Sequence, residues 1–199
     1  MENITEKKEF NKSRNKSLKL LLPFFVTVLG SILLIMTVFL PFASATDNHK
    51  EHLENYSDTM YVEELDMTNE DAIDISLFEY ARMYSVLAEK GISKSVSIAC
   101  IVIIAIFGGF SLLTLIFSIF KKAIPTLIFS ILSFAAFYIT KWDFKDRGVI
   151  PNDNYDWGLA ETVCYIGIIV AIIGAIALLI VKIIDKKNSK MEEEKWKNY

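Results

Sequence analysis

The sequence has few of the residues that build metal centres and thiol chemistry. Its 199 residues include two cysteines and two histidines, and no C-x-x-C occurs, which excludes a thiol oxidase of the paired-cysteine type. The only histidine-bearing cluster is His49 and His52 with Glu51 and Glu54. Structural zinc sites need about four ligands, so we expect these histidines to be solvated, with a bound metal as the alternative. No cofactor is expected.

Nucleotide-binding and catalytic motifs are missing as well. The sequence contains neither G-x-x-x-x-G-K nor G-x-G-x-x-G. No pairing of a nucleophile with a general base stands out. The sequence therefore predicts neither an enzyme nor a nucleic-acid-binding protein.

Charge is absent from four long stretches of at least 18 residues each: 20–46, 95–120, 123–140 and 162–181. A helix rises about 1.5 Å per residue, so each stretch can cross the roughly 30 Å hydrocarbon core of a bilayer. Buried helices of soluble domains are usually shorter and keep a polar face. We predict an all-α integral membrane protein, a bundle of four transmembrane helices at 20–44, 95–120, 125–140 and 162–182.

The first stretch also resembles a secretion signal. Basic residues precede it, and Ala43-Ser44-Ala45 fits the A-x-A pattern of a signal-peptidase site. Signal peptides have apolar stretches of roughly 7–15 residues, whereas Leu20 to Ala43 spans 24. We expect a retained span; cleavage, which would leave three spans, is the alternative.

Basic residues set the expected orientation. The first 19 residues, the short connection at 121–122 and the segment 182–199 hold 14 of them, and the other two connections hold 7. The positive-inside rule then makes the tails 1–19 and 183–199 and the turn 121–124 cytoplasmic, and places 45–94 and 141–161 outside. Isoleucine outnumbers leucine, and lysine and asparagine are frequent, which favours an AT-rich bacterial genome. We expect a multi-pass protein of a bacterial cell membrane.

The first outer segment, 45–94, is acidic, with 12 acidic and 4 basic residues. We expect it to form a small α/β cap. Its alternation of apolar and polar residues predicts a hairpin that pairs 60–67 with 72–75. Ser76 and Glu79 fit a capping box, which predicts a helix over 77–90.

Small residues form faces on two of the spans. On the fourth span, Ala160, Cys164, Gly167, Ala171 and Gly174 repeat at 4-3-4-3 spacing. The second span has Ala105, Gly108 and Gly109. Such faces let helices approach closely in lipid, either inside the bundle or against a partner's span.

Two further pairs of residues stand out. Trp142 and Trp157 fall at the ends of the third and fourth spans, where tryptophans anchor at the lipid headgroups. Cys100 and Cys164 lie on spans that are diagonal in an up-down bundle. Because diagonal backbones exceed the roughly 7 Å limit for a disulfide, we expect two buried free thiols.

The layout of a large first outer loop, a very short inner turn and a small second outer loop resembles claudin-like tetraspan proteins in topology alone. That family carries tryptophan and a cysteine pair in its first outer loop, and this chain has neither there, so no residue role is transferred. None of the four uncharged stretches contains Asp, Glu, Lys, Arg or His, which disfavours a proton-coupled carrier. We expect an accessory or interaction subunit that binds a membrane protein partner through its acidic outer domain and small-residue faces. A homo-oligomeric pore or transporter is the alternative.

Overall fold

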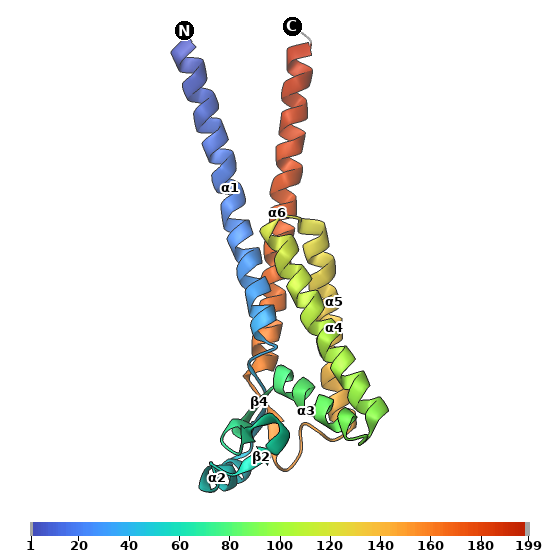
Figure 1. The fold of residues 1–199 in the computed structure, drawn as a ribbon. Coiled ribbons are helices and arrows are strands. Elements are labelled where there is room, and N and C mark those ends of the chain that lie inside the picture. The colour runs from blue at the N-terminus through green and yellow to red at the C-terminus, as the bar shows by residue number, and fades with distance from the viewer. Residues whose placement is uncertain (1, 198–199) are drawn as a thin grey trace.

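The chain forms four long helices with a small mixed domain at one end (Figure 1). The computed structural model describes residues 2–197, without the side chains of 2–18, 192, 193 and 195–197. Residues 1, 198 and 199, the ends of the two predicted tails, lie outside the described residues. The long helices are α1 (Glu2–Met36), α4 (Lys94–Ile119), α5 (Ala123–Asp146) and α6 (Leu159–Lys197). Each contains a segment long and apolar enough to cross a membrane, which confirms the prediction of four such helices.

The four helices pack as a ring. Neighbouring pairs are α1 with α6, α6 with α5, α5 with α4, and α4 with α1, so that α4 and α6 lie diagonally. Cys100 of α4 and Cys164 of α6 are both buried and both free. The two chain ends lie at the same end of the bundle as the turn between α4 and α5, and the small domain lies at the other end (Figure 1).

The bundle is apolar on the outside and partly polar inside. Isoleucine, leucine and phenylalanine side chains form most of its exposed surface, while serine and threonine side chains are buried between the helices. The Ser111 hydroxyl is buried without a hydrogen-bond partner among the described residues. Most of the other buried hydroxyls donate to carbonyls one turn earlier, as Thr27 does to Pro23 at 2.6 Å and Ser130 to Thr126 at 2.8 Å. This is the pattern of helices that pack together in lipid, where polar groups avoid the outer surface.

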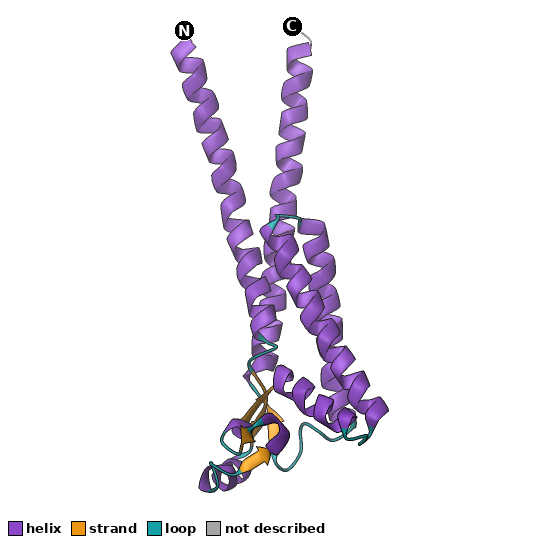
Figure 2. Cartoon of the chain, viewed as in Figure 1, coloured by secondary structure: helices purple, strands orange, loops and turns teal. Residues whose placement is uncertain are grey.

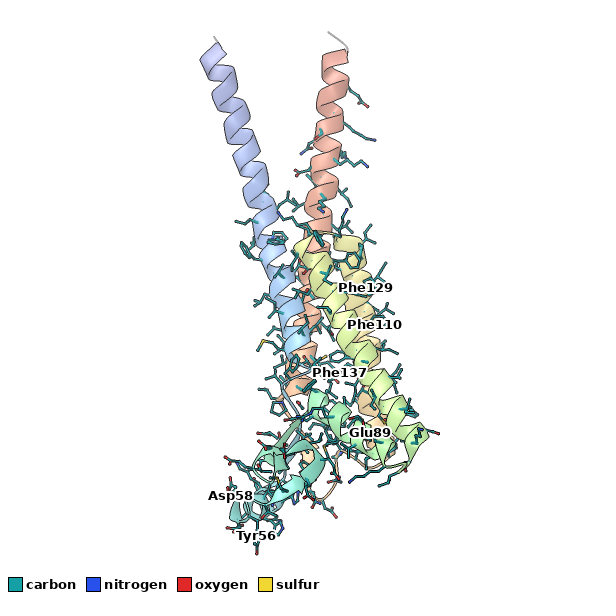
Figure 3. The ribbon with its side chains drawn as sticks, viewed as in Figure 1. Tyr56, Asp58, Glu89, Phe110, Phe129 and Phe137 are labelled. Atoms are coloured by element: carbon teal, nitrogen blue, oxygen red, sulfur yellow. The ribbon has the colours of Figure 1, made fainter. Side chains whose placement is uncertain are left out.

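Aromatic rings fill the seam between α4 and α5. Phe110 of α4 and Phe129 of α5 have ring centroids 5.9 Å apart, and Phe107 and Phe137 have theirs 5.4 Å apart. Figure 3 labels Phe110, Phe129 and Phe137 along this seam.

The small domain, called the cap below, consists of residues 37–93 and 147–158. A three-stranded antiparallel sheet in the order β4-β1-β5 is built from β1 (Pro41–Ala45), β4 (Asp74–Ser76) and β5 (Tyr155–Trp157). Figure 2 shows these strands beyond the bundle. The remaining elements are α2 (Asp47–Asn55), β2 (Met60–Val62), η1 (Glu63–Leu65), β3 (Met67–Thr68), η2 (Asp71–Ile73) and α3 (Leu77–Glu89).

The structure differs from the expected first span in where the helix stops. α1 ends at Met36, and the last residues of the predicted span 20–44 form β1 instead. Pro41 has no backbone N–H for a helix to use, and the following residues pair on both sides, with β4 and with β5. The triplet Ala43-Ser44-Ala45 therefore lies in the central strand of the sheet, so cleavage there would remove that strand.

The predicted hairpin between 60–67 and 72–75 is wrong. Within 60–68 the chain turns back on itself at Asp66, where φ is +50°, so that β2 pairs with β3. β4, which contains residues 74–76, pairs with β1 instead. The predicted helix is confirmed as α3, with both hydrogen bonds of the capping box between Ser76 and Glu79.

Candidate functional sites

The small residues of α6 pack against α1. Ala160, Cys164 and Ala171 are fully buried. A Cβ atom placed on Gly167 would lie 3.0 Å from the Cβ of Leu33, and one on Gly174 would lie 2.6 Å from the backbone nitrogen of Thr27. Of the two uses open to this face, packing within the bundle is the one this structure contains.

The α1 side of this contact is equally tight. A Cβ on Gly30 would lie 2.7 Å from the Cα of Ala171, closer than real Cβ atoms come to other atoms. Sequence reasoning did not single out Gly30, because one glycine in an apolar run shows no spacing pattern. The two backbones approach closely only because glycines face each other across the contact.

The small residues of α4 are in a different situation. Ala105 and Gly109 are exposed, and no atom of the described residues lies within 4 Å of a Cβ placed on Gly109. Gly108 faces inward, and a Cβ placed on it would lie 3.9 Å from the Cγ2 of Val38. Exposed residues at spacings of three and four make up one continuous stripe, called the open face of α4 below: Val102, Ala105, Gly109, Leu112 and Ile116.

The two tryptophans differ in their surroundings. Trp142 is 61% exposed near the end of α5. Trp157 is half-buried in β5, with its ring edge-on to Phe42 at 5.4 Å and the Lys141 ammonium 4.8 Å from its centroid. Lys141 also forms an ion pair with Glu161, which ties α5 to α6.

A polar network joins the cap to α5. Arg147 donates to the Asp143 carboxylate at 2.6 and 3.1 Å and to the hydroxyl of Tyr84 at 2.9 Å. The Cys100 thiol lies 3.7 Å from the same carboxylate. All charges in this network are matched, so its function in the fold is to fix α3 on the bundle.

A pocket of about 310 Å³ lies between α3, the sheet and the loop before β5. Four tyrosines line it: Tyr61, Tyr80, Tyr84 and Tyr155. Burial raises the pKa of Tyr80, and the neighbouring Tyr61 and Tyr84 raise it further, so the Tyr80 hydroxyl stays protonated. Sequence reasoning missed this site. A usable signal existed, since five of the eight tyrosines lie in 45–94 and 141–161.

The two histidines of α2 lie near each other but without further metal ligands. Their rings stack with centroids 6.4 Å apart, and the His49 ring also lies edge-on to the Tyr155 ring, with centroids 5.1 Å apart. In the part of the chain that the structure describes, no group of three or more His, Cys, Asp and Glu side chains is placed to hold a metal ion.

The sequence and the structure were compared with protein families, with curated proteins and with solved structures, and no match was found in any of the three.

Proposed function

We propose that this chain is an accessory subunit in a cell membrane, where the open face of α4 docks a transmembrane helix of a partner. The observation that carries the proposal is the contrast between the small residues of two helices. On α6, glycines are covered by α1; on α4, Ala105 and Gly109 are exposed on the outside of the bundle.

Small residues matter in lipid because apolar burial supplies no force between helices there. Close backbone approach supplies van der Waals packing in its place. Gly109 gives no such packing within this chain, because nothing lies near the position of its missing Cβ. A partner helix with its own small residues would approach closely at Ala105 and Gly109, as α1 approaches Gly167 and Gly174 of α6.

The proposed orientation has both tails and the turn at 121–122 in the cytoplasm. Together with Lys182 those segments carry 14 basic residues, and the segments 45–94 and 141–161 carry the other 7. The two groups of segments lie at opposite ends of the bundle, as the positive-inside rule requires (Figure 1). The cap, with its net acidic first segment, then offers the partner a second surface outside the membrane.

The test is a matched pair of glycine substitutions in the full chain, Gly109→Leu and Gly167→Leu, with the complex extracted gently and weighed by native mass spectrometry. The wild-type chain is expected to carry a second polypeptide. Gly109→Leu should keep the helical circular-dichroism signal and the unfolding midpoint of the wild type but lose that polypeptide. Gly167→Leu should lose the fold, because its side chain meets Leu33 and Leu34.

Two results would contradict the proposal: a wild-type chain that extracts as a monomer, or a Gly109→Leu variant that keeps the full complex. A complex made only of copies of this chain would point to the alternative, a homo-oligomeric pore or transporter. Most hydroxyls between the helices do not favour that alternative, because they donate to carbonyls of their own helix, as Ser130 and Thr140 do. Ser111 is an exception, since its hydroxyl has no partner among the described residues.

A further inference from the structure

The two ends of the bundle differ in how their basic side chains are balanced. Segments 45–94 and 141–161, at the cap end, hold seven basic residues, and four of these form ion pairs with carboxylates. At the opposite end, none of the lysines with a described side chain forms an ion pair with a described carboxylate. All of these lysines are exposed: Lys19, Lys121, Lys122, Lys182, Lys186, Lys187 and Lys190. That end therefore carries positive charge that the described residues do not neutralise.

Three of these lysines meet where the turn between α4 and α5 touches α6 (Figure 1), and they are called the lysine cluster below: Lys121, Lys122 and Lys182. The Lys182 ammonium donates to the backbone carbonyl of Lys121, 61 positions away in the sequence. The Lys121 ammonium lies 4.9 Å from the centroid of the Phe24 ring, which brings α1 to the same place. The cluster therefore exists only in the folded bundle.

The contacts within the bundle leave most donors of the lysine cluster unused. An ammonium has three N–H groups. That of Lys182 gives one to a carbonyl, and that of Lys121 faces an aromatic ring. The described carboxylates at this end are Asp185, which is half-buried and already has a partner, and Glu194, further along α6. The remaining N–H donors are available to an anion from outside the chain.

The position of the lysine cluster selects the kind of anion. Exposed apolar side chains begin directly beside it, on α1 and on both sides of the turn: Leu22, Phe25, Phe120 and Ile124. Lysines at the end of a membrane-spanning helix extend their ammonium groups to the depth of the lipid headgroups. A phospholipid can give its phosphate to the cluster and its acyl chains to the apolar surface, whereas a soluble anion would be held by charge alone.

We propose that the lysine cluster binds the headgroup phosphate of an anionic phospholipid, in the leaflet at the end of the bundle opposite the cap. A zwitterionic lipid offers the same phosphate but adds an ammonium group that the cluster repels. The bound phosphate bridges the turn and α6 and so stabilises this end of the bundle. The proposal rests on the proposed membrane location of the bundle but not on a partner at the open face of α4, so each can fail alone.

The first experiment titrates the full chain in neutral detergent with phosphatidylglycerol and with phosphatidylcholine of the same acyl chains, and counts bound lipid by native mass spectrometry. Phosphatidylglycerol should bind at least about 10-fold more tightly, as expected for three lysines at a membrane surface. Equal affinity for the two lipids would overturn the proposal. So would displacement of phosphatidylglycerol by inorganic phosphate at the same concentration, because the site would then accept any phosphate.

Substitutions then locate the site. The double variant Lys122→Gln with Lys182→Gln should lose the preference for phosphatidylglycerol, and arginine at both positions should keep it, because the charge is retained. Lys122→Gln alone, which removes no contact within the chain, should weaken phosphatidylglycerol binding about 5-fold. The matched control is Lys94→Gln with Lys145→Gln, two exposed lysines at the cap ends of α4 and α5 that form no ion pair with a described residue. An equal loss of binding in this control would contradict the site.

The stabilising effect is tested in nanodiscs. Replacement of phosphatidylcholine by phosphatidylglycerol should raise the unfolding midpoint of the wild-type chain and of the control, but not that of the double glutamine variant. An equal rise in the double variant would show a diffuse effect of membrane charge instead of a site. A chain that keeps its partner polypeptide in the mass spectrum but shows no lipid preference would contradict this proposal alone.

Discussion

The contact between α1 and α6 and the core of the cap are packed in opposite ways. Between α1 and α6 lie small residues and hydroxyls, among them Gly30, Gly167 and Ala171, whereas aromatic rings fill the seam between α4 and α5. Aromatic rings also fill the junction between the cap and the end of α5: Phe144 of α5 is edge-on to Tyr80 at 4.9 Å and to Phe42 at 5.2 Å. The outside of the cap carries the acidic residues, among them Asp58 at its tip (Figure 3).

The difference follows from the solvent that each part meets. In water, burial of apolar surface contributes roughly 25 cal/mol per Å², so large rings in the interior stabilise the cap. In lipid that contribution vanishes, and helices associate through close packing and hydrogen bonds between small residues. The chain thus has two cores that are stabilised differently, one in the bundle and one in the cap. Phe42 contacts both, since its ring meets Tyr80 of the cap and Phe137 of α5.

The largest expected effect is on the bundle, from Gly174→Leu. The new side chain would overlap the backbone of Thr27, which cannot move without separating α1 from α6. We expect a loss of more than about 4 kcal/mol, seen as failure to fold. Unfolding in mixed micelles of increasing dodecyl sulfate content, followed by circular dichroism, measures it. Gly109→Leu, on the open face, is the control; equal instability of the two variants would remove the distinction between the faces.

Phe42→Ala should give the next largest effect, and the effect should be confined to the cap and its junction with the bundle. Phe42 is fully buried and meets Tyr80, Phe137, Phe144 and Trp157 edge-on. Removal of a buried phenylalanine costs about 3–5 kcal/mol. Hydrogen exchange should speed up in the sheet and α3 while α6 stays protected. Equal loss of protection along α6 would show that the two cores are one.

The bundle was predictable because its signal is local. A run of residues without charge predicts each span, and the pair Ser76 and Glu79, three residues apart, predicts α3. β1 could not be predicted, because 20–46 reads as one apolar run. The strand is decided by pairing with Ile75 and Trp157, far along the chain. The hairpin prediction failed for the same reason.

The candidate sites divide in the same manner. The spacing of small residues on α6 and α4 identifies both faces, but which one is covered depends on where α1 lies. The position of α1 depends on Gly30 and Thr27, which contact the small residues of α6, and neither belongs to a spacing pattern in the sequence. The pocket joins Tyr61, Tyr80 and Tyr155, which lie far apart in the sequence and meet only in the folded cap, so no spacing pattern predicts it.

A smaller effect is expected from Ser76→Ala, which tests whether the cap also depends on local hydrogen bonds. The Ser76 hydroxyl accepts from the Glu79 backbone N–H at 3.2 Å, and the Glu79 carboxylate accepts from the Ser76 N–H at 2.7 Å. Loss of such a cap costs about 1 kcal/mol. Chemical unfolding of the cap, followed by near-ultraviolet circular dichroism, measures it. Ser85→Ala, on the exposed side of the same helix, is the control and should change little; equal losses would deny the capping box its contribution.

The smallest effect is a pH dependence that belongs to the cap alone. Burial, with a further contribution from His52, lowers the pKa of His49 below the usual 6.5, and its Nε2 is buried without a hydrogen-bond partner among the described residues. The unfolded chain therefore takes up the proton first as the pH falls. The stabilisation is present in full above pH 6.5 and decreases below it. The unfolding midpoint of the cap should fall between pH 7.5 and 5.5 by more in the wild type than in His49→Phe, which keeps the ring against Tyr155. His52→Ala should keep most of the dependence, because burial is the larger cause. An identical pH response in His49→Phe would assign the dependence to the carboxylates of the cap.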